Sequence, residues 1–169
     1  VLFLLTADSL AGVLPTIRSR CVSFAVAPVS PADCARYCTA HGVDKKTAAL
    51  YSELFDGHIG TVLTAARDKA RTEQVDKAME LARAAQAGDS YTAAVLLAPY
   101  EKDKAGAAAL LRDLRAVAAA GLQGSPHAPV QGQQAQRTLR LAEAAIQRLG
   151  AQVNPKIVLT VFAARLAHA

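Results

Sequence analysis

Two arginines separated by one serine are the residues of this chain whose types and spacing best suit chemistry. Arg18, Ser19 and Arg20 stand between two apolar segments, with Cys21 directly after them. Arginine carries a planar fork of donors that stays charged and binds phosphate through two bonds at once, which lysine cannot do. Two guanidinium groups at the boundary between two elements therefore predict a tip that meets an anion. A solvated basic turn without a ligand is the alternative interpretation.

The segments on either side of this tip have the composition of β-strands. Residues 2–6 form a continuous apolar run of the kind found in the middle of a parallel sheet. Residues 22–26 alternate large apolar side chains with small ones, as a half-buried strand does. Between the two, Asp8 and Ser9 can cap a short helical turn that Pro15 then closes. The predicted unit is strand, short helix, basic tip and strand.

The composition favours helices for most of the chain. Of its 169 residues, 52% are hydrophobic but only 5% are aromatic, which suits close-packed helices better than sheets. The net charge of +5 comes from basic residues spread along the chain, so no single strip indicates a nucleic-acid site. No apolar run approaches the about eighteen residues that cross a membrane. We predict a soluble, cytoplasmic protein.

The cysteines and histidines are interpreted as structural residues. Three cysteines are an odd number, which argues against a disulfide framework. Cys34 and Cys38 could share a helix face and form half of a metal site, but no second pair with ligand spacing completes it. We therefore expect small buried thiols and no metal. His58 has no nucleophile or carboxylate partner within sequence reach, and no catalytic role is assigned to the other three histidines: His41, His127 and His168.

Three short helices are predicted after a linker that contains two prolines. The first starts with Ser30 as its N-cap and stops at Gly42, the second starts after Asp44, and the third begins near His58. Three short helices in about forty residues cannot build a large core, so they need a neighbour to pack on.

Apolar stripes predict five further helices in the rest of the chain. They cover residues of about 72–87, 90–97, 107–122, 135–149 and 154–166. The third of these carries Arg112, Asp113 and Arg115 on the face opposite its stripe, which we interpret as a solvated surface. The loop 124–132 has no periodicity and contains two prolines, so it is predicted to be mobile.

The basic tip and its flanking segments closely resemble the end of the AAA+ ATPase-type domain of bacterial clamp-loader subunits, most closely those of the delta-prime type. The resemblance is carried by the run Pro-Thr-Ile-Arg-Ser-Arg-Cys at residues 15–21. It implies that Arg20, between Ser19 and Cys21, is an arginine finger that acts in the ATP site of a neighbouring subunit. It also implies a sensor-1-like position for Thr6.

Two later segments resemble the same family. Residues 57–61 are similar to a motif at the start of the third lid helix, where active subunits carry an arginine that contacts nucleotide and this chain has Thr61. A hydroxyl cannot replace a guanidinium against phosphate charge. Residues 153–162 resemble the start of a late helix of the collar domain. The resemblance therefore implies a subunit that does not hydrolyse ATP.

The expected fold is predominantly all-α. Residues 1–26 would be the remnant of an AAA+ α/β sheet, residues 27–69 a three-helix lid, and residues 70–169 a helical collar for oligomerisation. Because the chain opens on a core-type strand and lacks a phosphate loop, we expect it to be the C-terminal part of a longer protein. No catalysis and no cofactor are expected from this part alone.

The resemblance implies a function in DNA replication. The complete protein would help the clamp loader of DNA polymerase III place a sliding clamp on primed DNA, acting on ATP and Mg²⁺ held by a neighbouring subunit. Its partners would be the gamma/tau and delta subunits, the clamp and, through the complex, the DNA, without a membrane. Two alternatives stay open: a gamma/tau-type ATPase subunit of the same family, and an unrelated helical scaffold or DNA-binding module.

Overall fold

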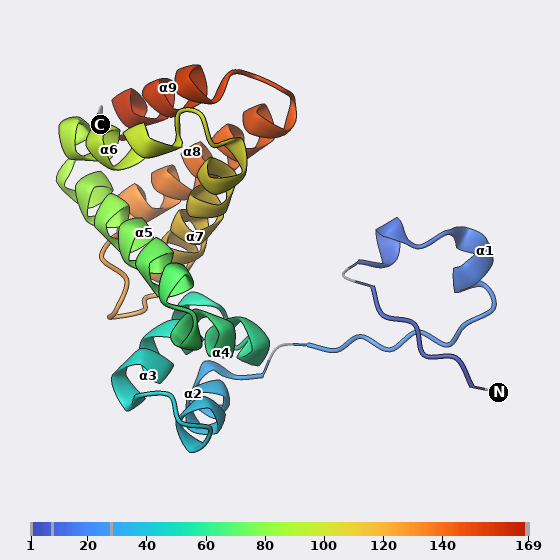
Figure 1. Cartoon of the computed structure of the whole chain (residues 1–169). Helices are drawn as coiled ribbons and strands as arrows, with labels where there is room; N and C mark the ends of the chain where they lie inside the picture. The colour runs from blue at the N-terminus through green and yellow to red at the C-terminus, as the bar shows by residue number, and fades with distance from the viewer. Residues whose placement is uncertain (1, 8, 28, 168–169) are drawn as a thin grey trace.

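Helices build nearly all of the ordered architecture of this protein. The computed structural model describes residues 2–7, 9–27 and 29–167, and these include helices but no strand. Three parts follow one another along the chain: an N-terminal arm (2–27), a three-helix unit (29–67) and a helical body (69–167) (Figure 1). The predominantly all-α prediction is confirmed.

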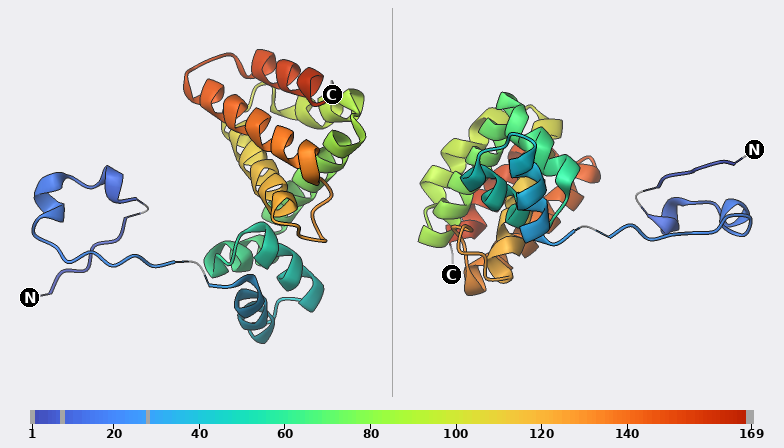
Figure 2. Two further views of the ribbon diagram at one scale, coloured as in Figure 1. Left: turned by 180° about the vertical axis from the view of Figure 1, so that it is seen from behind. Right: turned by 90° about the horizontal axis from the view of Figure 1, so that it is seen from below.

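The N-terminal arm extends away from the helices in every view of the ribbon (Figures 1 and 2). It contains a 3₁₀ turn, η1 (Leu10–Gly12), and one turn of helix, α1 (Pro15–Arg18). The Ser9 hydroxyl accepts a 3.2 Å bond from the Ala11 amide, so the predicted cap at Ser9 is confirmed, whereas Asp8 lies outside the described residues. Pro15 begins a helix instead of closing a turn, because its fixed φ and missing N–H suit the first helical position.

The two segments predicted as strands do not form strands. Residues 2–6 and 22–26 have no regular structure, and their large side chains are exposed, with Phe24 at 84%. A strand needs a second strand to receive its backbone hydrogen bonds, and neither segment has one among the described residues. The prediction failed because β-propensity describes how a residue fits a sheet that exists, and the residues that the structure describes form none.

The three-helix unit consists of α2 (Pro31–Ala40), α3 (Lys45–Leu54) and α4 (Ile59–Arg67). The Ser30 hydroxyl accepts from the Asp33 amide at 3.1 Å, and Asp44 accepts from two amides of the first turn of α3, so both predicted caps are confirmed. Between α3 and α4, Gly57 has a φ of +73°, and a Cβ there would lie 1.7 Å from the Val29 carbonyl oxygen. Only glycine fits this turn, because any side chain would collide with the linker backbone.

Five α-helices and one 3₁₀ turn form the helical body. They are α5 (Lys69–Ala87), α6 (Ser90–Leu97), η2 (Ala98–Tyr100), α7 (Lys104–Leu122), α8 (Gly132–Gly150) and α9 (Pro155–Ala167). Helix α7 packs lengthwise against α8 and α5, while α6 and α9 pack together across one end (Figure 1). The sequence predicted all five α-helices, and α6 begins and ends where expected. In α9, Ile157 is 59% exposed, whereas Leu159 is buried.

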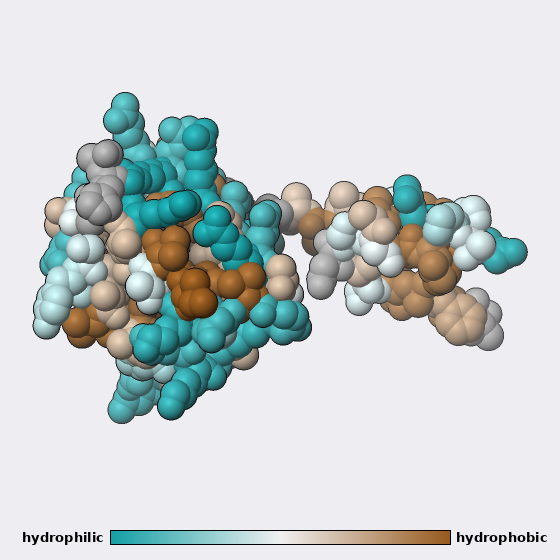
Figure 3. Space-filling model, turned by 90° about the horizontal axis from the view of Figure 1, so that it is seen from above, coloured by the Kyte–Doolittle hydropathy of each residue, from teal (hydrophilic) through white to brown (hydrophobic). Residues whose placement is uncertain are grey.

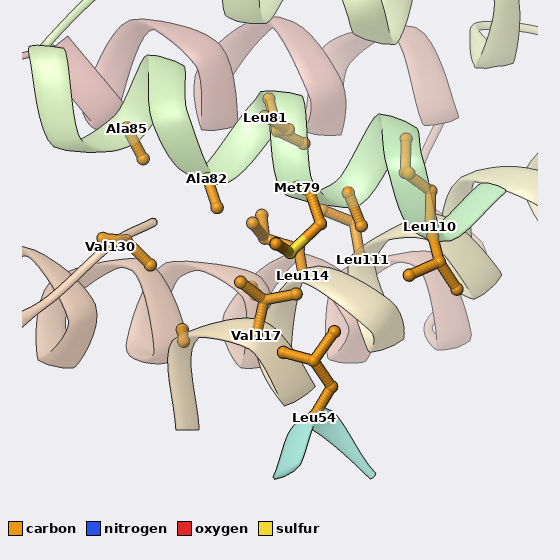
Figure 4. Packing of buried hydrophobic residues seen from close by; sticks show 14 of the residues in the cluster. Leu54, Met79, Leu81, Ala82, Ala85, Leu110, Leu111, Leu114, Val117 and Val130 are labelled. Atoms are coloured by element: carbon orange, nitrogen blue, oxygen red, sulfur yellow. The ribbon is translucent and has the colours of Figure 1, made fainter. Parts of the chain in front are cut away.

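One apolar core runs through the body and continues into the three-helix unit. Its centre is filled by leucine and valine side chains of α5 and α7, and Leu54 from the end of α3 approaches Val117 from below (Figure 4). Burying such side chains is worth about 1.5–3 kcal/mol each. The three short helices therefore find the neighbour that they were predicted to need.

The loop between α7 and α8 (residues 123–131) is part of this packing. The sequence predicts a mobile loop, whereas Ala128 and Val130 are buried and the Val130 carbonyl oxygen would lie 1.9 Å from a Cβ on Gly121. The amide of Gln131 also donates to the Gln86 side chain at 2.9 Å. The buried side chains of Ala128 and Val130 thus hold this loop in place. The sequence does not indicate this, because the loop has no hydrophobic periodicity.

A buried ion pair fixes the start of α5 to α7. Asp113, predicted on a solvated face, is 6% exposed, and its carboxylate accepts two bonds from Arg71 and one of 2.8 Å from Gln74. The Asp113 bonds raise the pKa of Arg71 despite its partial burial. The guanidinium also lies over the Phe55 ring, 5.7 Å from its centroid. The arginines near Asp113 in the sequence indicated a solvated face, but the Asp113 side chain points toward α5 and binds Arg71 and Gln74 there.

We expect Asp113→Ala to lower the free energy of unfolding by about 3 kcal/mol, because it leaves the largely buried guanidinium of Arg71 without a partner. Urea unfolding measures this change. Glu101→Ala is the control, since it removes an exposed ion pair in which the two charged atoms are 3.3 Å apart, and it should cost at most about 0.5 kcal/mol. Equal effects of the two variants would contradict the structural role of Asp113.

Candidate functional site

The basic tip is formed by the end of α1 and the turn after it. The Ser19 amide donates to the carbonyl groups of Pro15 and Ile17, and its hydroxyl donates to Thr16 at 3.2 Å. The Arg20 Nη1 donates a long bond of 3.5 Å to the same carbonyl oxygen of Thr16. Cys21 follows as an exposed free thiol. The short helix thus ends in a turn that displays Arg18 and Arg20.

The chemistry available at this tip is anion recognition. Arg18 and Arg20 are exposed, and within the described residues neither forms an ion pair with a carboxylate. A shallow hollow of about 460 Å³ beside the tip is lined by Leu10, Pro15, Arg18, Ser19 and Ser23. These groups offer charge and hydrogen-bond donors to a phosphate, but no general base.

A second hollow lies between the three-helix unit and the helical body. This inter-unit cleft has a volume of about 440 Å³ and takes residues from both sides. Its apolar lining includes Leu54, Phe55, Ala116, Ala120 and Leu139, and its polar lining includes Glu53, His58, Thr61, Arg115 and Glu143. A cleft of this size at a junction of two units is a common place for ligands.

The structure does not bring the predicted site residues together. Ser19, Arg20 and Cys21 lie at the tip of the arm, Thr6 lies exposed on its first segment, and Thr61 lines the inter-unit cleft at the start of α4. Within this chain they form two separate places, and the arm contributes nothing to the cleft lining. The tip and Thr61 therefore do not share a site within this chain.

Sequence reasoning missed a polar cluster at the edge of the cleft. The Oε2 atom of Glu53, on α3, accepts a bond from the Ser125 hydroxyl and lies 2.9 Å from Nδ1 of His127. The His127 amide in turn donates to Ser125 Oγ at 3.3 Å. His127 had been assigned no role because its partner is 74 positions away in the sequence. No local pattern could have revealed this contact.

The order of groups in this cluster excludes a catalytic triad. In a Ser-His-acid triad the imidazole lies between the hydroxyl and the carboxylate, so that it can take the serine proton. Here the Glu53 carboxylate lies between Ser125 and His127. The cluster can therefore link α3 to the α7–α8 loop, but His127 is not placed to activate Ser125.

The environment of Glu53 favours its charged form. Partial burial opposes the charge, but the bonds from Ser125 and His127, together with the attraction of His127, outweigh it and lower the Glu53 pKa. A carboxylate that accepts two hydrogen bonds is stabilised against protonation. The cluster is therefore strongest where Glu53 is ionised.

The two cysteines of α2 are core residues. Cys34 and Cys38 are fully buried free thiols, which confirms the interpretation made from their spacing. Burial raises the pKa of Cys38, and the neighbouring Cys34 raises it further, so the thiol stays neutral and unreactive. No group of three or more His, Cys, Asp or Glu residues in the described ranges could hold a metal ion.

No family model, curated protein or solved structure matches this chain. The resemblance to clamp-loader subunits therefore rests on the motif residues themselves. Of the helices that the structure describes, none is long and apolar enough to span a membrane.

The Glu53 cluster should make stability depend on acid. Because the folded state lowers the pKa of Glu53, its contribution is present above the ordinary value of 4.5 and is lost as pH falls through the lower folded value. We expect Glu53→Gln to remove about 1 kcal/mol at neutral pH and to flatten the pH dependence below that value. Urea unfolding across this range is the measurement. Glu143→Gln, at another carboxylate of the cleft, should keep the wild-type slope.

Proposed function

We propose that this chain belongs to a non-hydrolysing, delta-prime-type subunit of a bacterial clamp loader, in which Arg20 acts in trans on ATP and Mg²⁺ of a neighbouring subunit. The observation that carries the proposal is the Ser-Arg-Cys sequence at an exposed tip (19–21), on an arm that stands apart from the helices (Figures 1 and 2). The gamma/tau and delta subunits, the sliding clamp and primed DNA are the proposed partners.

The physical basis is the charge that develops during phosphoryl transfer. Negative charge spreads over the oxygens of the transferred γ-phosphoryl group, and a guanidinium can donate two parallel bonds to them. An exposed tip can enter a neighbour's site without breaking its own core. Arginine fingers of this kind raise the rate by roughly 10³–10⁵.

The residue at the start of α4 favours a non-hydrolysing subunit over a gamma/tau-type ATPase. Thr61 stands where the resemblance would place a nucleotide-contacting arginine, and it lines the inter-unit cleft together with Arg115 of α7. A threonine hydroxyl cannot neutralise phosphate charge. In this proposal the chain contributes a finger to its neighbour and hydrolyses no ATP itself.

An apolar surface on the helical body supports the proposed role in assembly. Apolar residues gather on the end formed by α6 and α9 (Figure 3), where Tyr91, Val95 and Ile157 are exposed. Helix α6 carries no charged residue, and its exposed face combines Tyr91 and Val95 with the hydroxyl groups of Ser90 and Thr92. Exposed apolar patches commonly mark protein interfaces. This end is where a collar could meet neighbouring subunits.

In a reconstituted clamp loader, we expect Arg20→Ala to leave assembly intact and to lower ATP turnover at the adjoining site by roughly 10³-fold or more. Gel filtration measures assembly, and steady-state DNA-stimulated ATPase measures turnover when the other sites are inactivated. Arg36→Ala is the control, since it removes the same charge from an exposed position on α2, outside the tip, and should retain turnover. Wild-type turnover in Arg20→Ala would refute the finger.

We further expect the chain alone to show no micromolar affinity for ATP with Mg²⁺, because Thr61 supplies no cation at the lid position. Isothermal titration calorimetry is the measurement. Micromolar binding that Thr61→Ala abolishes would favour the gamma/tau-type alternative, since the hydroxyl would then be a nucleotide contact.

A further inference from the structure

We propose that Glu53, Ser125 and His127 form a latch that holds the three-helix unit against the helical body, and that the inter-unit cleft opens when this latch is released. The inference concerns motion within the chain and does not rest on the proposed function. It starts from the way in which the two units are joined.

The covalent connection between the units is a single non-helical residue. Asp68 ends α4 and also caps α5, with an extended backbone (φ −96°, ψ 112°). Its side chain accepts from the Ala70 amide at 3.0 Å, so its main role is to start α5. One residue between two helices allows them to change direction through few backbone angles, which is the usual form of a hinge.

Hydrogen bonds that join the two units occur at two places among the described residues. The first is the hinge itself, where the Thr72 hydroxyl donates to Ala65 at 2.8 Å. The second is the cluster of Glu53 with Ser125 and His127, between α3 and the α7–α8 loop. Bonds at the hinge barely resist rotation about it. The Glu53 cluster joins segments far from the hinge in sequence, so it opposes that rotation.

The loop that carries Ser125 and His127 is firmly attached to the body. Its Val130 side chain is fully buried, and Gln131 donates from its amide to Gln86 and from its side chain to the Ser125 carbonyl group at 3.4 Å. The loop therefore holds the Ser125 hydroxyl and the His127 imidazole in fixed positions beside α3. Breaking the bonds to Glu53 would release the edge of α3 from the loop, while Leu54 stays packed in the shared core.

The latch lies in the wall of the cleft that it would control. Glu53 lines the cleft from the three-helix side, opposite Arg115 and Glu143 of the body. Its side chain is 30% exposed and that of His127 is 46% exposed, so water can compete for both groups. Bonds of this kind are reversible, because an exposed polar pair loses little when water replaces it. The buried contacts of Leu54 and Phe55 nearer the core limit how far the unit can swing.

Thiol labelling in the cleft tests the latch directly. In a Cys21→Ser background, Ala120→Cys places a thiol in the cleft lining at a position that is only 3% exposed, so a reagent reaches it mainly when the cleft opens. We expect Glu53→Gln and His127→Ala each to raise the labelling rate of this thiol by roughly fivefold, the factor that corresponds to the loss of about 1 kcal/mol. The double variant should label no faster than the faster single variant, since both open one latch.

Two internal controls distinguish opening from unfolding. Cys34 and Cys38 are fully buried within the three-helix unit, so their labelling reports unfolding of that unit. It should be slower than labelling at Ala120→Cys and should accelerate with added urea, because unfolding exposes much more surface than opening of the cleft. Glu143→Gln changes a carboxylate on the other wall of the cleft and should leave the rate at Ala120→Cys unchanged. Equal rates with equal urea dependence at the buried thiols and at Ala120→Cys, an unchanged cleft rate in Glu53→Gln, or additive effects in the double variant would each overturn the latch.

Discussion

The arrangement of the whole molecule depends on one buried carboxylate. Asp113 lies in the middle of α7 among leucine and valine side chains, where an unpaired charge would be very costly. Arg71 and Gln74, in the first two turns of α5, satisfy it, and this fixes how α5 leaves the hinge. Because Phe55 packs under the same guanidinium, α3 is drawn to the junction as well. One ion pair thus sets the direction in which the three-helix unit projects.

The inter-unit cleft follows from this geometry. The end of α3 is held near α7 by the apolar contacts of Leu54, while α4 continues into α5 through Asp68. Two groups of helices that touch near the hinge and at one edge leave a hollow between these contacts. The Glu53 cluster occupies the edge, where its carboxylate is partly hydrated and its bonds can exchange with water. The apolar packing at the junction stabilises the contact between the two units. The polar bonds at the edge can break and form again without disrupting that packing.

Local chemistry predicted the helices, and distant contacts decided what they do. Ser30, Asp44 and the glycines between helices act within a few residues, so the sequence located those helix ends. Helices α5, α7 and α8, in contrast, each begin about three residues before the predicted start. Asp113 and His127 acquire their roles from partners 42 and 74 positions away, which no periodicity encodes. The prediction of strands was wrong for a different reason. Residues 2–6 and 22–26 have the composition of strands, but composition cannot supply the neighbouring strand that completes a sheet. The candidate residues Arg20 and Thr61 were found by motif, and their separation became visible only in the fold.

The arm and the body differ in the kind of contact that each can make. The arm buries almost nothing: its apolar side chains are exposed, and its polar groups bond mainly within one turn. The exposed guanidinium of Arg20 is therefore available to an anion through charge and hydrogen bonding. The body instead satisfies its buried charge internally and leaves an apolar end at α6 and α9. Burial of apolar area contributes binding free energy but is not directional. A guanidinium forms directional hydrogen bonds but contributes little binding free energy in water. A subunit that assembled through the α6–α9 end of its body and acted through Arg20 on its arm would use both kinds of contact. No residue would have to serve both purposes, because the two parts lie apart.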